Sequence, residues 1–384
     1  MIHVRILLLS VLFCFKTTFV TAQSTPTLNW KSYTQLPAQL TLGHQPGLAG
    51  AFTGVIGDYL FIAGGANFPF GMPWAGGKKT FWKDIYILSL SEQDSPQWIY
   101  NSTNNLPEPL AYGASVSIPD GIVCLGGENE KGISDQAFII KQGKTINQPI
   151  VIQSLPTLPV PLRNHSAGLL GNTVFVIGGE TTVGVSNHVY KLNLDASIPV
   201  WEQATMLPMA LSHQVCIPVK QDGKDYLYMV GGRKKNDHSL TTFYNSLLCY
   251  DVEKNTWITK PGLPFALSAA VGAIWKQKYL VIVGGDRGEH FAKAETILLL
   301  IERANNKEEV EKLRGQLAAL QSSHPGFSKT VLLYNLETSQ WTTSSDLPFP
   351  PPVTTTAVNW KNYLIVPSGE VRAGIRTPTI LLCH

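Results

Sequence analysis

The sequence has few cysteines, few charges and no apolar run long enough to cross a membrane. Its five cysteines among 384 residues have no metal-type CxxC spacing, which argues against a zinc motif. Charged residues make up only 15%, and 30 basic side chains are balanced by 27 acidic ones. This balance argues against nucleic acid or an acidic membrane surface as partner. With 44% apolar residues, the chain can nevertheless bury a large core.

The first 22 residues are typical of an export signal. Arg5 gives a positive start, residues 6–20 are mostly apolar, and small residues at 20–22 offer a cleavage site. A membrane anchor would need about 20 unbroken apolar residues, whereas Lys-Thr-Thr at 16–18 interrupts this run. We therefore expect a cleaved signal over residues 1–22, an exported protein, and no membrane attachment after cleavage.

Four cysteines would remain in the mature chain: Cys124, Cys216, Cys249 and Cys383. They are widely spaced, and three lie in expected strands. Export permits disulfides, but we expect buried free thiols.

A pair of glycines ends a short apolar run five times. The pairs lie at 64–65, 126–127, 178–179, 231–232 and 284–285, and a sixth copy has Ser368 and Gly369. The intervals are 62, 52, 53, 53 and 84 residues. A period of roughly 50 residues with paired glycines is typical of kelch repeats, each of which forms a four-stranded blade. The sequence therefore predicts an all-β fold, a six-bladed kelch-type β-propeller, over residues 23–384.

A Leu-Pro pair accompanies each repeat, and a Trp usually precedes it by six to eight residues. Pro suits the turn between blades because it fixes φ and needs no backbone donor. The tryptophans belong on the outermost strands, packed against a neighbouring blade: Trp30, Trp98, Trp201, Trp257 and Trp341. The second repeat has none, and we expect its outer strand over residues 149–153.

The two ends of the chain each hold part of one blade. After Gly369 only one more strand fits, at residues 377–382, and no Trp strand follows. Trp30 precedes the first glycine pair without a blade of its own. We therefore expect residues 28–33 to supply the outer strand of the last blade, which would leave no open edge around the ring.

An insertion at about residues 286–329 explains the 84-residue interval. Its segment 302–323 is rich in Glu, Lys, Leu and Ala and has no Pro, so we expect a helix whose apolar face holds Leu313, Leu317 and Leu320. Two interpretations stay open. The helix either decorates the surface or forms a lid over the channel mouth, since it leaves from the loop after a glycine pair.

Polar side chains follow both sequence markers. In a blade of antiparallel strands, the loop entering the first strand and the loop from the second to the third lie on the same face. Residues after both markers should therefore meet around one mouth, where propellers bind small molecules, although loop residues are often polar without contacting a ligand. After the glycine pairs come Asn67, Glu128, Glu180, Arg233, Asp286, Arg287 and Glu370; after Leu-Pro come Tyr112, Arg163, His165, His213 and Ser268.

The loop SGEVRAGIRTPT of the last blade (residues 368–379) holds Glu370, Arg372 and Arg376 within seven residues. Glu370 could accept and return a proton, while Arg376 could hold a carboxylate through two hydrogen bonds and stay charged. The alternative is an ion pair within the loop that only stiffens the turn.

Three segments resemble the N-acetylneuraminate epimerase family, the bacterial sialic acid mutarotases. They are residues 47–68, residues 111–129 and above all GEVRAGIRT at 369–377. The chain is most similar to a cyclically permuted branch, because the last of these blocks lies mid-chain in other members. The aromatic loop NFPFGMPWAGGKKTFW (67–82) departs from the family's pattern, which bears on the substrate more than on the reaction.

The resemblance implies an isomerase that interconverts the anomers of a sialic acid by general acid–base ring opening and closure. Glu370 is then the proton acceptor and Arg376 assists it. Arg163 and His213 lie in segments that also resemble the family, and with the rim residues Asn67, Glu128 and Arg233 they are candidates for binding the substrate. The substrate is a small sugar acid, no metal or other cofactor is needed, and the family likeness implies the periplasm.

The main alternative is a kelch propeller that binds a sugar or a protein without catalysis. A sialidase would carry repeated SxDxGxTW boxes, which this sequence lacks. A copper oxidase on this scaffold would need a Tyr, His and Cys copper site, and the scattered histidines give no support for one.

Overall fold

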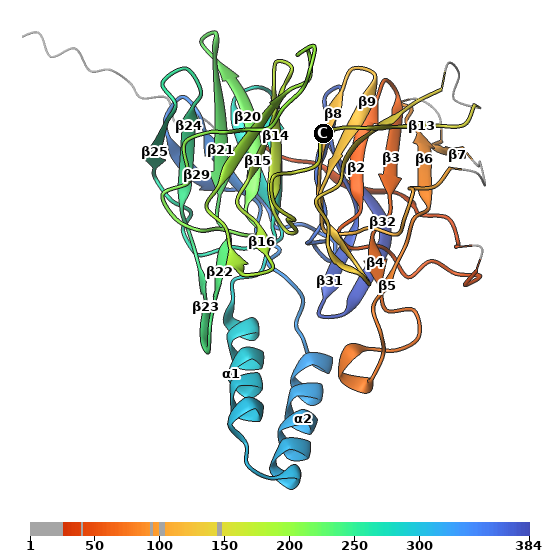
Figure 1. The fold of residues 1–384 in the computed structure, drawn as a ribbon, viewed down its shortest axis with the longest axis vertical. Coiled ribbons are helices and arrows are strands. Elements are labelled where there is room, and N and C mark those ends of the chain that lie inside the picture. The colour runs from red at the N-terminus through yellow and green to blue at the C-terminus, as the bar shows by residue number, and fades with distance from the viewer. Residues whose placement is uncertain (1–25, 40, 93–94, 100–103, 144–147) are drawn as a thin grey trace, which may run out of the picture.

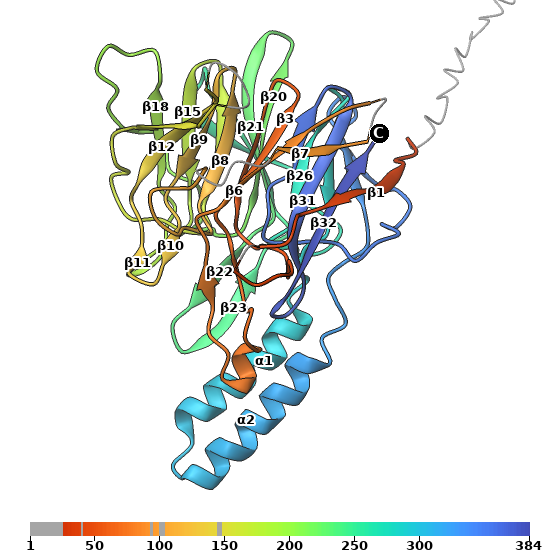
Figure 2. The same cartoon turned by 90° about the vertical axis from the view of Figure 1, so that its right-hand side faces the viewer.

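The computed structural model describes residues 26–39, 41–92, 95–99, 104–143 and 148–384. Within these residues the chain forms six four-stranded sheets, arranged as the blades of a propeller (Figures 1 and 2). The predicted six-bladed all-β propeller is thus confirmed. The predicted signal segment, residues 1–22, lies outside the described residues.

Five blades each use four strands in chain order. The first contains β2 (Phe52–Ile56), β3 (Tyr59–Ala63), β6 (Ile85–Ser89) and β7 (Gln97–Ile99). The second contains β8 (Ala114–Ile118), β9 (Gly121–Leu125), β12 (Ala137–Lys141) and β13 (Val151–Ser154). The third contains β14 (Ser166–Leu170), β15 (Thr173–Ile177), β18 (Val189–Asn193) and β19 (Glu202–Gln203). The fourth contains β20 (Val215–Gln221), β21 (Lys224–Val230), β24 (Leu247–Asp251) and β25 (Thr256–Lys260). The fifth contains β26 (Val271–Trp275), β27 (Tyr279–Val283), β28 (Leu332–Asn335) and β29 (Gln340–Thr343).

The sixth blade joins the two ends of the chain, as the sequence predicts. It contains β30 (Val358–Trp360), β31 (Tyr363–Arg372), β32 (Ile375–Cys383) and, as its outer strand, β1 (Trp30–Gln35). Trp30 pairs with Cys383 and Gln35 with Thr379. The outer strand lies two residues later than the predicted 28–33, and the ring has no missing edge.

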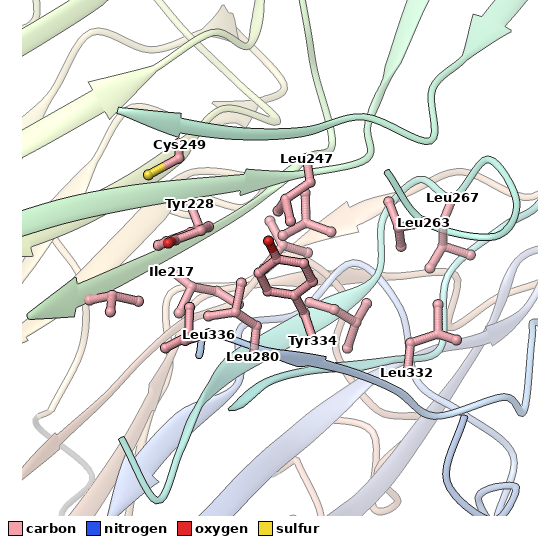
Figure 3. Close-up of a cluster of buried hydrophobic side chains, with 14 residues drawn as sticks. Ile217, Tyr228, Leu247, Cys249, Leu263, Leu267, Leu280, Leu332, Tyr334 and Leu336 are labelled. Atoms are coloured by element: carbon pink, nitrogen blue, oxygen red, sulfur yellow. The ribbon is translucent and has the colours of Figure 1, made fainter. Parts of the chain in front are cut away.

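The second strand of each blade is buried on both faces, because the blade lies between two neighbours. This explains the apolar β-branched runs such as TVFVI in β15 and YLVIV in β27. One apolar cluster fills each of the six interfaces between blades in the described chain. Figure 3 shows the cluster between the fourth and fifth blades, where Tyr228 and Leu247 meet Leu280 and Tyr334.

The four cysteines of the described chain are free, as predicted. Cys124, Cys249 and Cys383 are buried, and Cys216 is partly exposed. The strand tryptophans pack where expected: the indole of Trp341 joins the cluster of the preceding blade and donates to the Pro261 carbonyl at 2.7 Å.

The glycine pairs are required by backbone conformation and by close packing. Gly64 and Gly65 have φ of 67° and 93°, in the left-handed region that favours glycine. A Cβ on Gly64 would lie 2.3 Å from the carbonyl oxygen of Leu110, which belongs to the next blade. In the last blade, Ser368 (φ 56°) replaces the first glycine, and its Oγ accepts from the Leu48 amide at 2.8 Å. Each pair therefore ties its blade to the following one.

A closed ring of six backbone hydrogen bonds links the blades at the channel. One residue from each blade donates its N–H to the carbonyl of the previous member, at 2.7–3.3 Å. All six have φ between 51° and 65°. The members of this throat ring are Gly50, Tyr112, Asn164, His213, Ala269 and Thr354. All six line a smaller channel cavity, and all except Gly50 also line a mouth cavity, so the ring lies where the two cavities meet.

The loops from the second to the third strand extend from one face of the propeller. Four form short hairpins: β4 (Ala66–Asn67) with β5 (Thr80–Phe81), β10 (Glu128–Asn129) with β11 (Gly132–Ile133), β16 (Glu180–Thr181) with β17 (Gly184–Val185), and β22 (Arg233–Asn236) with β23 (Ser239–Phe243). A short 3-10 helix, η1 (Pro73–Ala75), lies within the first of these loops.

The insertion in the fifth blade is a helical hairpin rather than the single predicted helix. It comprises α1 (Glu289–Arg303) and α2 (Lys307–Ser322), which project from the same face as β22 and β23 (Figures 1 and 2). Asn306 caps α2 through its side chain, so the segment predicted as one helix from 302 begins later. The first helix was missed because its TILLLIE run fits a strand as well as a helix. No helix in the described segments is long and apolar enough to cross a membrane.

Removal of β1 should destabilise the protein, because the whole edge of β32 would lose its hydrogen-bonded partner. We expect a chain that begins at Pro37 to unfold at a lower temperature than a chain that begins at Thr27, which keeps β1. Calorimetric melting of both proteins tests this. Equal melting temperatures would show that the sixth blade does not need its N-terminal strand.

Candidate functional site

A cavity of about 570 Å³ opens at the mouth on the side of the helical insertion. This volume is within the range of small-molecule sites. Most of its polar lining comes from residues that follow the glycine pairs and the Leu-Pro pairs, which the sequence predicts to lie on one face of the propeller. Among these residues are Glu128, Arg163, Glu180, His213, Arg233, Asp286, Glu370 and Arg376.

Glu370 and Arg376 face each other across the last hairpin. They are Cα partners on β31 and β32, so their side chains emerge on the same face. Arg376 Nη2 lies 3.4 Å from Glu370 Oε2, and the Gly374 amide donates to Oε1 at 2.8 Å. The backbone of Glu370 pairs with Val353 through two hydrogen bonds of 2.8 and 2.9 Å. The carboxylate is therefore held in one place while it lines the cavity.

Arg376 keeps unused donors inside the protein. Its side chain is only 4% exposed and lies over the Phe68 ring, 4.7 Å from the centroid. Nε and Nη1 are buried and have no hydrogen-bond partner among the described residues. Buried donors without partners are rare in proteins and call for an explanation. A ligand that carries an anionic group would provide one.

A chain of alternating charges follows the rim. Lys79 contacts Glu128 at 2.9 Å, and Arg163 bridges Glu128 and Glu180. Asn164 also donates to Glu180, at 3.1 Å. Because each charge has an opposite neighbour, these groups hold fixed positions at the mouth.

His213 continues this network in a defined tautomer. Its Nε2 lies 3.0 Å from Nη2 of Arg233, which can only donate, so Nε2 accepts and the proton sits on Nδ1. Nδ1 lies 3.1 Å from Ser212 Oγ and 3.6 Å from Glu180 Oε1. Burial, together with the charges of Arg233 and Arg163, holds the pKa of His213 well below its usual range. His213 is therefore a neutral group at the cavity wall.

Arg233 lies among carboxylates and against the insertion. Burial lowers its pKa, and the nearby charges of Glu180, Asp286, Glu370 and Glu295 oppose that effect. Its guanidinium lies 4.7 Å from the ring centroid of Phe291 on α1. Burial raises the pKa of the neighbouring Asp286 carboxyl.

Some residues predicted at the mouth lie elsewhere. Asn67 is buried and does not line the cavity, because its amide donates to the Gly47 carbonyl and accepts from the Trp82 indole, both at 2.9 Å. Arg287 stacks on Phe265, with 3.7 Å to the ring centroid, outside the cavity. Ser268 is buried at its bridge to Asp286. His165 lines the channel below the throat ring, not the mouth.

The sequence reasoning missed several lining residues. Phe68, Trp74 and Lys79 belong to the aromatic loop, which was noted only as unusual. His290, Phe291 and Glu295 lie on α1 and His324 directly follows α2. One signal in the sequence could have identified them: the insertion begins directly after the glycine pair at 284–285, in a loop on the face of the mouth. The insertion lines the mouth, which is the position that the lid interpretation requires.

The cavity combines carboxylates, free guanidinium donors and the neutral imidazole of His213 with apolar walls. This set can bind an anionic polar molecule and transfer a proton to or from it. Among the described residues, no group of three or more His, Cys, Asp or Glu side chains is placed to hold a metal ion.

The free energy of unfolding should fall on acidification, partly because of His165. Burial lowers the pKa of His165 to about 4. Below about pH 6.5, the pKa of His165 in the unfolded chain, the unfolded chain binds a proton at His165 but the folded chain does not. The free energy of unfolding then falls by up to about 1.4 kcal/mol per pH unit. His165→Gln should reduce the loss of stability between neutral pH and about pH 5, measured by denaturant unfolding. The exposed His44 provides a control, His44→Gln. Equal losses in both variants would contradict the assignment.

Comparison with known proteins identifies relatives of this chain. The chain matches the N-acetylneuraminate epimerase family over residues 15–147 and 155–383. It is 28% identical over 229 residues to N-acetylneuraminate epimerase of Salmonella enteritidis, a match that covers 59% of this chain and 57% of the relative. It is 35% identical over 128 residues to the Vibrio cholerae protein of that name, covering 30% of this chain and 32% of the relative.

The fold also resembles a solved structure described as "Structure of YjhT". That likeness has a TM-score of 0.63 at 14% identity, and it covers 92% of this chain and 97% of the other. The sequence match to the Salmonella relative, by contrast, spans little more than half the length of that relative. The cyclic permutation stays a prediction. Because the family match extends over most of the sequence, the chain belongs to the N-acetylneuraminate epimerase family.

Proposed function

We propose that this protein is a mutarotase that interconverts the anomers of a sialic acid. The observation that carries the proposal is the pair Glu370 and Arg376. They stand on one hairpin, 3.4 Å apart, at the wall of a cavity, and two donor atoms of Arg376 are unused. The names of the relatives, N-acetylneuraminate epimerase, support the same substrate class.

The cavity is suited to a sugar acid. A sialic acid carries a carboxylate on its anomeric carbon, and Arg376 offers Nε and Nη1 to such a group. The aromatic side chains Phe68, Trp74 and Phe291 provide apolar walls for the sugar ring. Binding of the carboxylate at Arg376 would bring the anomeric hydroxyl close to Glu370, because the two side chains share one face of the hairpin.

The reaction needs only proton transfer. Glu370 removes the proton from the anomeric hydroxyl, the bond between the anomeric carbon and the ring oxygen breaks, and the hydroxyl oxygen becomes a ketone. The protonated Glu370 then gives that proton to the former ring oxygen. Rotation about the neighbouring carbon–carbon bond presents the other face of the ketone, and the same steps in reverse close the ring. Acid–base assistance of this kind accelerates reactions by roughly 10²–10⁴-fold.

Substitution of Glu370 should remove catalysis but leave the fold intact. Glu370→Gln keeps the size of the side chain and can still accept from the Gly374 amide, but it cannot take up the proton. We expect anomer exchange to slow by roughly 10²–10⁴-fold, to the rate in buffer. Anomer-resolved proton NMR of freshly dissolved N-acetylneuraminate measures it. The matched control is Glu130→Gln at an exposed position; unchanged turnover of Glu370→Gln would remove Glu370 from the mechanism.

The same assay on Arg376→Lys separates binding from chemistry. Lys keeps the charge but loses the fork of donors, so KM should rise by about tenfold or more. The exposed Arg314 provides the control, Arg314→Lys. If the unaltered protein binds the sugar acid while anomer exchange runs at the buffer rate, the alternative of a binding propeller without catalysis is correct.

We also propose that the protein is exported, to the periplasm in a cell with two membranes. Support comes from the positive start, apolar run and small residues of positions 1–22. Sequencing of the N-terminus of the protein from its native cell tests the proposal. A mature chain that begins near Gln23 is expected, and retention of Met1 would contradict it.

A further inference from the structure

Two histidines of the helical insertion meet at the cavity beside the Glu370 hairpin. His290 lies in the first turn of α1 and His324 directly follows α2, and their ring centroids are 4.3 Å apart. Both line the mouth cavity. Two residues after His324, a Cβ on Gly326 would lie 3.5 Å from the Val371 carbonyl oxygen. The segment that follows His324 therefore lies near the tip of the hairpin that carries Glu370 and Arg376, and both imidazoles share one cavity with that hairpin.

The contacts of His324 fix where its proton lies. The Gly326 amide donates to Nδ1 of His324 at 3.0 Å, so Nδ1 is an acceptor and the neutral ring carries its proton on Nε2. Burial lowers the pKa of His324 to about 4, and the nearby His290 and Arg372 act in the same direction. His324 therefore presents an uncharged N–H donor, and its Nε2 has no hydrogen bond within the described residues.

His290 offers a complementary group. Its Nε2 is buried and has no hydrogen-bond partner in the described part of the chain. Such an atom is unfavourable unless a ligand satisfies it. A neutral donor beside an unpaired ring nitrogen suits a neutral group that has one acceptor and one donor. It does not suit a second carboxylate, for which a charged donor would be expected.

We propose that His290 and His324 recognise the N-acyl group of the sugar acid. The acyl carbonyl accepts from Nε2–H of His324, and the amide N–H donates to Nε2 of His290. The acyl methyl lies against Phe327, whose ring centroid is 5.1 Å from that of His324. This inference rests on the proposed function and deepens it: the insertion selects N-acylated sugar acids, whereas the hairpin performs the proton transfer.

The arrangement assigns different tasks to the two sides of the cavity. Arg376 and Glu370 would act on the anomeric centre, which every sugar acid of this kind shares. The imidazole pair would act on the one substituent that distinguishes N-acetylneuraminate from its analogue with a hydroxyl in place of the acylamino group. A site built to hydrogen-bond one group discriminates against a ligand that lacks it.

The test compares these two substrates in the unaltered protein and in three variants. His324→Phe keeps an aromatic ring against His290 and Phe327 but removes both ring nitrogens, and His324→Gln restores an N–H donor. With His324→Phe, kcat/KM for N-acetylneuraminate should fall by about tenfold, while kcat/KM for the hydroxy analogue should change by less than about twofold. His324→Gln should recover part of the preference. The control is His238→Ala, whose side chain is 89% exposed on the β22–β23 hairpin.

A binding measurement keeps the inference separate from the proposed function. Calorimetric titration of the unaltered protein and of His324→Phe with both sugar acids requires no turnover. If neither sugar acid is turned over but the unaltered protein still prefers the N-acyl form and His324→Phe does not, the proposed function fails and the inference stands. An equal loss of affinity or kcat/KM for both sugar acids in His324→Phe would overturn the inference, as would the absence of any loss.

Discussion

The throat ring of six backbone hydrogen bonds is the constraint on which the rest of the structure depends. Each member adopts a left-handed φ that most residues avoid, including the β-branched Thr354, and a closed circle of donors and acceptors offsets that strain. The residue before each member forms a bridge with the first residue after a glycine pair, or after Ser368 and Gly369 in the last blade. Glu128, Glu180, Arg233, Asp286 and Glu370 are all held in this way. The same ring thus closes the propeller and sets the spacing of the polar side chains at its mouth.

The cavity is built by two kinds of element with different rigidity. Positions at the strand ends carry most of the charges, and their backbone is fixed by bridges to the segment that leads into the first strand of the blade. The aromatic loop and the helical insertion supply aromatic walls and two of the imidazoles, those of His290 and His324. Contact between η1 and α2 joins these two elements across the opening. A propeller of this kind can therefore change which ligands it admits by exchanging loops, while the charged side chains at the strand ends stay in place.

Much of the fold followed from the sequence because its markers have local physical causes. Paired glycines mark a left-handed turn that has no room for a Cβ. The 84-residue interval between the last two markers indicates the insertion. Strand parity then placed Glu370, Arg163 and Arg233 on one face, and Arg376 follows Glu370 on the same loop. Asn67 did not follow this rule, because its neighbour Ala66 occupies the rim position and the Asn67 amide is satisfied inside the loop. The contribution of α1 could not be foreseen, since an apolar run of that length does not distinguish helix from strand.

The pairing of β1 with β32 has a consequence for synthesis. Trp30 pairs in register with Cys383, almost the full length of the chain away. A nascent polypeptide can form its first five blades in order, but the circle cannot close until the last residues have left the ribosome. Contacts of such long range form slowly. The incomplete intermediate would expose the face of the first blade that packs on the sixth, and β1 would have no partner strand. A chaperone or transport factor could shield both until the final strands arrive.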